Sequence, residues 1–363
     1  MTTDADQPLH RPIIEVKGHN ISLAQLLEVM RAQKTSDLYL KIGSPIRLKI
    51  EGRVVTGESP PISRRQMDYI IGCFLTEEQR RVFHRRLVAD VVHIQKEARY
   101  RLHFGFGHTG PYATIRAIGQ EIMPFGKLGH PHRVAQFLQQ ITSGLLVLCG
   151  STDAGKTVTC ASLLDHINQT RQAAILTLED PIEYIYEDRR SLVLQREVGL
   201  HVPTFADGIR SALRENLDVV FVGEMRETDT VEQVLRAGET GHLVVTTLHS
   251  DDALSAITRI IGTFPSSDQP RIRQSLAATL TGVLYQRLLP RRGGGRVPCV
   301  ETLWANTAVR NILRSGDLGK LGSYVGRATG GIGYRECLVD LRSFDHIDAD
   351  VLAQEQARLA AGQ

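Results

Sequence analysis

The apolar positions in the second half of the chain fall into short, unbroken runs of strand length. Leu145–Cys149 and Val219–Val222 are examples, and AAILTL at 173–178 and HLVVTTL at 242–248 have the same form. Runs without internal polar alternation are typical of strands in a parallel sheet that is covered on both faces. Helical patterning fills most of the remaining positions up to about Gly316. We therefore predict an α/β unit with a mostly parallel sheet in this part of the chain.

The first part of the chain mixes two periodicities. Ser22 is predicted to cap a helix, because apolar residues follow it at helical spacing, and similar patterns follow Ser63 and Thr76. Strands are predicted at the alternating segments 37–42 and 46–51, and at two segments within 99–117 that a Gly-Pro turn joins. This mixture indicates a smaller α+β unit.

Clusters of glycine and proline suggest where the units begin and end. A Gly/Pro-rich stretch at 119–131 is predicted to be a linker, and three consecutive glycines within 291–296 predict a turn. The predicted division is a flexible segment over 1–20, an α+β domain over 21–118, the linker, a P-loop domain over 132–345 and a helical tail over 346–363.

Residues 150–157, GSTDAGKT, match the phosphate-loop pattern G-x-x-x-x-G-K-[ST]. A predicted strand precedes the motif and a predicted helix follows it, as the pattern requires. Backbone N–H groups of such a loop face phosphates, the lysine contacts the β- and γ-phosphates, and the hydroxyl binds Mg²⁺. The candidate residues for binding ATP are Gly150, Ser151, Thr152, Asp153, Ala154, Gly155, Lys156 and Thr157, with Thr157 also a candidate magnesium ligand.

Asp153 is an unusual residue for the interior of a phosphate loop. Its carboxylate either points to solvent or weakens nucleotide binding by repelling the phosphates. The sequence leaves both possibilities open.

Hydrolysis needs a carboxylate that orients water and another on the side of the metal. Glu179 and Glu224 each follow an apolar run, and the carboxyl ends of parallel strands are where α/β sheets bind ligands. Glu224 is a candidate magnesium ligand, partly through water, because Gly223 stands where a regular Walker B motif has Asp. The alternative is that these acids cap helices or pair with arginines.

His242 and His249 lie on either side of the run LVVTTL. An isolated histidine at a strand end is usually structural. Two of them beside the carboxylate runs suggest a sensor of the γ-phosphate or of its water.

Composition excludes several other classes of protein. No segment reaches the roughly 18–20 apolar residues that a membrane span needs, and no apolar signal segment is visible at the start. The five cysteines form no CxxC motif, so we expect reduced thiols and neither disulfides nor a zinc site. A net charge of +3 and 6% aromatic residues argue against a nucleic-acid motor.

Five stretches together resemble the secretion-superfamily ATPases (the GspE, PilT and VirB types), and most closely the PilT-like type IV pilus retraction motors of twitching motility. They are TSDLYLKIGSPIRLKIEGRV (35–54), GSTDAGKT (150–157), ILTLEDPIEY (175–184), LQREVG (194–199) with SALRENLDVVFVGEMRETDT (211–230), and TGHLVVTTLHSDDA (240–253). The resemblance implies a PAS-like domain followed by a RecA-like P-loop NTPase domain.

The resemblance also implies a function and partners. It implies Mg²⁺-dependent ATP hydrolysis in a cytoplasmic homohexamer that acts beside the inner membrane, with the pilus platform protein and other pilus motor subunits as partners and no nucleic acid. Glu179 would polarise water. Arg99, Arg101 and Arg116, in the segment RYRLHFGFGHTGPYATIR, would reach the phosphates.

Two features bear on which member of the family the chain resembles. It has no tetracysteine zinc module of the kind found in assembly ATPases, and AVRNILR at 308–314 resembles a helix of the retraction motors. Ser151, Asp153 and Ala154 replace the usual Pro, Gly and Ser of the phosphate loop. These departures leave a second hypothesis, a catalytically weak ring subunit or regulator of a partner ATPase.

Overall fold

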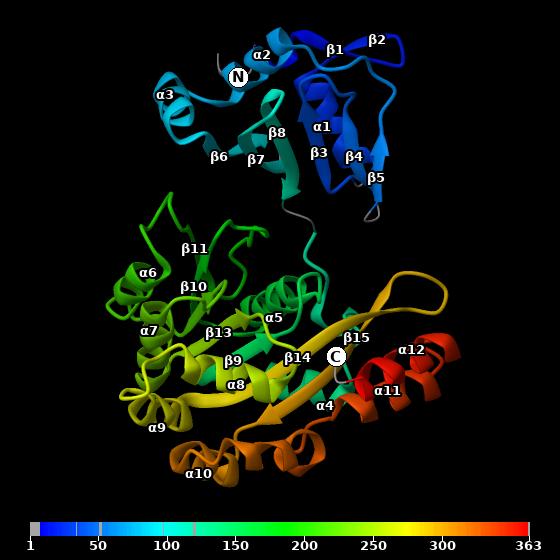
Figure 1. Cartoon of the computed structure of the whole chain (residues 1–363). Helices are drawn as coiled ribbons and strands as arrows, with labels where there is room; N and C mark the ends of the chain where they lie inside the picture. The colour runs from blue at the N-terminus through cyan, green and yellow to red at the C-terminus, as the bar shows by residue number, and fades with distance from the viewer. Residues whose placement is uncertain (1–7, 34, 51–52, 97, 119–120, 362–363) are drawn as a thin grey trace. The chain divides into compact units, whose positions relative to one another are not determined.

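The computed structural model describes residues 8–33, 35–50, 53–96, 98–118 and 121–361. The chain divides into two compact units, Met1–Gln120 and Glu121–Gln363 (Figure 1). The elements of the first unit are η2 (Pro8–His10), β1 (Pro12–Val16), β2 (His19–Ser22), α1 (Leu23–Ala32), β3 (Asp37–Lys41), β4 (Arg47–Ile50), β5 (Arg53–Thr56), α2 (Arg64–Phe74), α3 (Glu77–Arg86), β6 (Val88–Gln95), β7 (Ala98–Gly107) and β8 (Gly110–Ile118).

The first unit is built on an antiparallel sheet with the strand order β5-β4-β3-β8-β7-β6. Alternate residues of β7, including Tyr100, Leu102 and Phe104, are buried in its core. The predicted N-cap Ser22 is confirmed, and Ser63 and Thr76, which precede the other two predicted helices, are N-caps as well: each of the three forms a capping box with a glutamine three residues later. Each box satisfies backbone N–H groups that the first turn of a helix leaves unpaired.

Residues 1–20 were predicted to be flexible, but the part of this segment that the structure describes contains regular elements. β1 and β2 form an antiparallel hairpin over residues 12–22. Leu9 and Ile14 are buried against the core of the first unit. Burial of these two side chains stabilises the segment. The segment is short and largely polar, so its sequence shows no clear period of apolar residues.

The second unit contains the longer list of elements. They are η3 (Phe125–Lys127), α4 (His132–Gln140), β9 (Gly144–Cys149), α5 (Lys156–Thr170), β10 (Ala174–Glu179), β11 (Leu192–Glu197), α6 (Phe205–Ala212), β12 (Val219–Val222), α7 (Thr228–Glu239), β13 (Leu243–Leu248), α8 (Ala253–Gly262), α9 (Gln269–Thr279), β14 (Leu280–Pro290), β15 (Arg296–Trp304), α10 (Thr307–Ser315), η4 (Leu318–Tyr324), η5 (Gly326–Thr329), α11 (Tyr334–Ser343) and α12 (Ala349–Ala360).

The sheet of the second unit has the strand order β11-β10-β12-β13-β9-β14-β15 and is parallel except for β15. This confirms the predicted α/β class with a mostly parallel sheet. All residues of β12 and β13 are buried, as expected for strands that are covered on both faces.

The order of the strands determines which helices share a face of the sheet. The connection from β9 to β10 runs across the sheet in one direction, and those from β11 to β12, β12 to β13 and β13 to β14 run in the other. Because such crossovers are right-handed, α5 covers one face and α6 to α9 cover the opposite face. The packing of α7 against α6 and α9 agrees with this assignment.

The segment between Leu280 and Trp304 corrects the predicted helical pattern. The glycines at 293–295 do form a turn, but they join two long strands, β14 and β15, in an antiparallel pair. Most residues of both strands are buried. A strand with two buried faces has apolar residues at positions that also fit a helix, so periodicity alone cannot separate the two.

Residues at both ends of the second unit pack on its core. Phe125, within the predicted linker, is buried there. The predicted helix of the tail is present as α12, where the buried Glu355 accepts hydrogen bonds from Arg287 Nε at 3.1 Å and from the Tyr334 hydroxyl at 2.9 Å. Within the described residues, no helix is long and apolar enough to cross a bilayer.

Candidate functional site

The predicted site elements lie at one edge of the parallel sheet. Strands β9, β10, β12 and β13 run in the same direction. Their carboxyl ends lead into the glycine-rich loop, Glu179, Glu224 and His249 respectively. The loop follows β9, and the carboxyl ends of the strands are the usual position of ligands in an open α/β sheet.

Two glycines of the loop are required by the close approach of β14. Gly150 has φ +151° and Gly155 has φ +83°, values that residues with a Cβ rarely adopt. A Cβ on Gly150 would lie 2.3 Å from the backbone oxygen of Gln286, and one on Gly155 would lie 2.9 Å from its side-chain nitrogen. The loop therefore packs directly on β14.

Asp153 occupies a left-handed backbone position in the same loop. Its φ is +63°, which explains why glycine is usual at this position, and Asp is among the few other residues that tolerate it. Asp153 is exposed to solvent, and its backbone oxygen accepts a hydrogen bond from Arg296 Nη1 at 3.4 Å. Its exposure favours the first of the two possibilities, a carboxylate in solvent.

Lys156 begins α5 and folds back over the loop. Its ammonium donates hydrogen bonds to the backbone oxygens of Gly150, at 2.7 Å, and Ser151, at 2.8 Å. Burial lowers the pKa of Lys156, and the carboxylate of Glu224 opposes this shift. The loop therefore has a buried cation at the amino end of a helix, which together form an anion-binding site.

Glu224 and His249 come together at the ends of β12 and β13. The Oε1 atom of Glu224 lies 2.7 Å from Arg226 Nε and 3.6 Å from His249 Nε2. Burial and the charge of Lys156 lower the pKa of His249, whereas Glu224 raises it. The neutral imidazole of His249 is therefore favoured, and this side chain lies beside Glu224.

Glu179 is buried, with 5% of its surface exposed. Its carboxylate accepts hydrogen bonds from the Thr177 hydroxyl at 2.7 Å and from Gln195 Nε2 at 3.4 Å. Burial raises its pKa to about 7, although these hydrogen bonds favour the charged form. A carboxylate with this pKa is suited to taking a proton near neutral pH.

His242 is not brought to this edge, and its role as a phosphate sensor stays a prediction. It precedes β13, whose first residue pairs with Gly144 at the start of β9, so it lies at the amino edge of the sheet. Its Nδ1 lies 2.9 Å from the Thr240 hydroxyl and 3.1 Å from the Ala237 oxygen. The two histidines lie at opposite ends of β13. In the sequence they flank the same apolar run, so the pattern did not reveal that they lie at different edges of the sheet.

The three predicted arginines belong to the first unit and lie on one face of its sheet. Arg101 on β7 is directly opposite Arg116 on β8, and Arg99 is two residues before Arg101. Arg116 donates to the buried carboxylate of Asp37 at 2.8 Å, and Arg101 lies 3.4 Å from Asp90.

Gln286, on β14, contacts the loop and was not predicted. It is buried and donates a hydrogen bond to the backbone oxygen of Ala154 at 2.8 Å. A polar residue within the apolar run LYQRLL was the available signal. Because that run was predicted to be helical, the sequence did not place Gln286 beside the loop.

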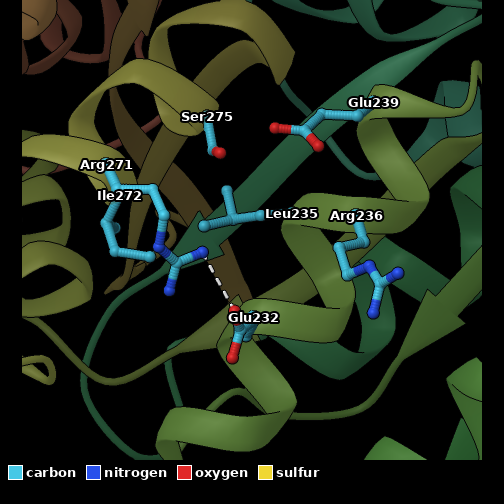
Figure 2. Close-up of a pocket in the computed structure, with 7 residues that line it drawn as sticks. All are labelled: Glu232, Leu235, Arg236, Glu239, Arg271, Ile272 and Ser275. Carbon is cyan, nitrogen blue, oxygen red and sulfur yellow. Dashed lines mark ion pairs between the residues drawn. The ribbon is translucent and has the colours of Figure 1, made fainter. Parts of the chain in front are cut away.

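A hollow of about 390 Å³ lies elsewhere, between α7 and α9 (Figure 2). Its lining includes Arg271 and Glu232, which form an ion pair at 2.9 Å. None of its lining residues belongs to the loops at the carboxyl ends of the strands, so it is not part of the site.

The residues at the strand ends fit a nucleotide triphosphate and a divalent ion. The loop offers backbone N–H groups and a buried ammonium, and Glu179 and Glu224 are acidic groups at the ends of other strands of the same sheet. The described residues include no cluster of three His, Cys, Asp or Glu side chains that could hold a metal alone. One hydroxyl and one carboxylate, with phosphates and water completing the shell, suit Mg²⁺. The fold and this site define a P-loop ATPase.

Comparisons with known proteins specify the family. A model of the family described as "Type II/IV secretion system protein" matches residues 19–293. The chain is 34% identical over 312 residues to the type IV pilus retraction ATPase PilT of Pseudomonas aeruginosa, covering 86% of this chain and 90% of that protein. It is also 34% identical over 314 residues to a twitching motility protein of Neisseria gonorrhoeae, covering 85% and 83%.

The same similarity extends to a solved structure. The pilus retraction motor PilT with bound ADP superimposes with a TM-score of 0.83 at 34% identity, over 92% of this chain and 97% of that one. The chain belongs to the type II/IV secretion system ATPase family, and it is a PilT-like, ATP-hydrolysing member of that family.

Proposed function

We propose that this protein is a Mg²⁺-dependent motor ATPase that powers type IV pilus retraction as a hexameric ring. The observation that supports this most directly is the similarity to retraction motors over nearly the whole length of both chains. An inner-membrane platform protein and other pilus motor subunits are its proposed partners.

In this proposal the loop holds the phosphates of ATP through its backbone N–H groups and Lys156. Thr157 and Glu224, the latter through water, would hold Mg²⁺, and the ion would neutralise charge on the phosphates. Attack by water forms a bond to the terminal phosphorus and breaks the bond to the bridging oxygen, which leaves on ADP. Glu179 takes the proton of the attacking water, because its buried carboxylate has a pKa of about 7.

Replacement of Glu224 by glutamine is expected to lower kcat by about 100-fold or more while ADP binding stays within about threefold. The amide keeps the size of the side chain but removes the charge that faces Arg226 and His249. Steady-state ATPase and calorimetric ADP binding measure the two effects. Glu227→Gln, an exposed acid three residues away, is the matched control and should leave both unchanged.

The same assay separates the motor from the regulator. A wild-type protein with no more ATPase activity than Glu224→Gln would contradict an active motor and favour a catalytically weak subunit of a partner ATPase.

Arg116→Ala is expected to lower the ATPase of the assembled protein by at least about 100-fold and to spare ADP binding. An arginine directed to a transferring phosphoryl group contributes about 10³-fold or more to turnover, whereas loss of its ion pair with the buried Asp37 lowers stability. Arg116→Lys should restore the pairing with Asp37 but not turnover, because an ammonium lacks the planar fork. Arg64→Ala, which removes an exposed pair with Asp68, is the control. Unchanged turnover in Arg116→Ala would show that this arginine is only structural.

The cellular role is tested by deletion of the gene. Retraction predicts cells that remain piliated but cannot retract their pili. Cells without pili would instead indicate an assembly motor.

A further inference from the structure

We propose that Gln286 is a positioning residue for ATP binding and turnover, and that it couples His130 to the shape of the phosphate loop. The inference rests on ATP use by this loop and is independent of the pilus role. It starts from three hydrogen bonds that converge on one buried amide.

The first two bonds fix the orientation of the Gln286 amide. The backbone oxygen of Ala154 can only accept, so the Nε2 group of Gln286 donates to it, at 2.8 Å. The Oε1 atom therefore faces the other way, and it accepts from the Thr159 hydroxyl at 3.0 Å. Gln286 thus joins the phosphate loop to the first turns of α5, with only 1% of its surface exposed.

The third bond fixes the tautomer of His130. Its Nε2 lies 2.9 Å from Gln286 Oε1, which can only accept, so this nitrogen holds the proton. Its Nδ1 is buried and has no hydrogen-bond partner within the part of the chain that the structure describes. Burial lowers the pKa of His130, which favours this neutral form.

His130 belongs to the segment 121–131, which directly follows the first unit in the chain. Its ring stacks on Phe125 with centroids 6.1 Å apart, and Phe125 is buried in the second unit. A shift of this segment would move His130 away from Gln286 and release the amide that holds the Ala154 oxygen. The first segment of the second unit therefore has a hydrogen-bonded connection to the loop through Gln286.

The contact between Gln286 and the loop is steric as well as polar. The main chain and side chain of Gln286 fill the space that a Cβ on Gly150 or Gly155 would need. Because the loop rests on this residue, loss of the amide would leave the Ala154 oxygen and the Thr159 hydroxyl without their partner, and the backbone N–H groups would lose their alignment.

The test compares variants of the full-length protein, with ADP as the probe. Gln286→Met keeps the length of the side chain and removes both hydrogen-bonding atoms. It is expected to weaken ADP binding by about tenfold and to raise KM more than it lowers kcat. His130→Phe keeps the stacking on Phe125, and should weaken ADP binding by about threefold. In the Gln286→Met background it should have no further effect, because it acts through the amide.

Thr302→Val is the matched control for loss of stability. The buried Thr302 hydroxyl accepts from Ile332 N at 2.8 Å, away from the loop. This variant should lower the melting temperature without changing ADP affinity.

Two results would overturn the proposal. ADP affinity within twofold of wild type in folded Gln286→Met would show that the amide is only structural. If His130→Phe weakened ADP binding by a further factor of about three in the Gln286→Met background, His130 would not act through Gln286. If Gln286→Met does not fold, His130→Phe and Thr159→Val take its place. Unchanged ADP affinity in both of these variants would also overturn the proposal.

Discussion

Replacement of Lys156 by alanine is expected to weaken ADP binding by at least about 100-fold and to abolish ATP hydrolysis. The ammonium is the buried cation of the loop, and a charge-assisted hydrogen bond to a phosphate contributes about 1.5–3 kcal/mol. Lys156 also donates to the backbone oxygens of Gly150 and Ser151, so its removal loosens the loop itself. Both effects act in the same direction.

Isothermal titration calorimetry with ADP measures this loss. Lys320→Ala makes the same chemical change at an exposed site, where Lys320 pairs with Asp317 at 2.6 Å, and should leave affinity unchanged. ADP affinity in Lys156→Ala within threefold of wild type would mean that this loop is not the nucleotide site.

Glu179→Gln is expected to lower kcat by about 10²–10⁴-fold and at the same time to stabilise the protein at alkaline pH. The pKa of Glu179 is raised from 4.5 to about 7 in the folded protein. Between these values the folded protein holds a proton that the unfolded chain has released. Stability therefore falls by about 1.4 kcal/mol per pH unit as the pH rises through this window, and the total cost above pH 7 is about 3 kcal/mol.

The variant removes that cost because glutamine is never charged. Its free energy of unfolding at pH 8 should exceed that of wild type by up to about 3 kcal/mol, and the difference should vanish near pH 4. Urea unfolding at the two pH values measures this. Glu187→Gln replaces a carboxylate of the same region that is 77% exposed, and should show neither effect.

A glutamate that is both destabilising and needed for turnover is one retained for function rather than for folding. If Glu179→Gln lost activity and stability together at pH 8, the carboxylate would be a structural group. If it kept full activity, the proton acceptor would have to be another residue.

Much of the site could be predicted from sequence because its chemistry is local. The loop from Gly150 to Thr157 is one contiguous segment whose glycines, lysine and hydroxyl have fixed spacing. Glu179 and His249 directly follow apolar runs and Glu224 is one residue beyond another, and parallel strands bring such positions to one edge. The N-caps were equally local, since each capping box spans four residues.

What the tertiary structure decided involves pairs of residues that are distant in the chain. Gln286 reaches the loop across more than a hundred residues, because β14 pairs with β9 in parallel. The helical interpretation of β14 failed because a strand buried on both faces has no period of two to reveal it. His242 shared a motif with His249, yet the direction of β13 placed it at the opposite edge of the sheet.

The sequence by itself therefore determined the class of the protein and the loop motif, and it predicted the acidic side chains at the neighbouring strand ends, because these depend on residue types at short spacing. Only the tertiary structure decided which strands lie beside the loop, and hence that Gln286 and His130 support it. It also decided the burial that raises the pKa of Glu179, because desolvation depends on everything packed around the carboxyl group and not on its neighbours in the chain.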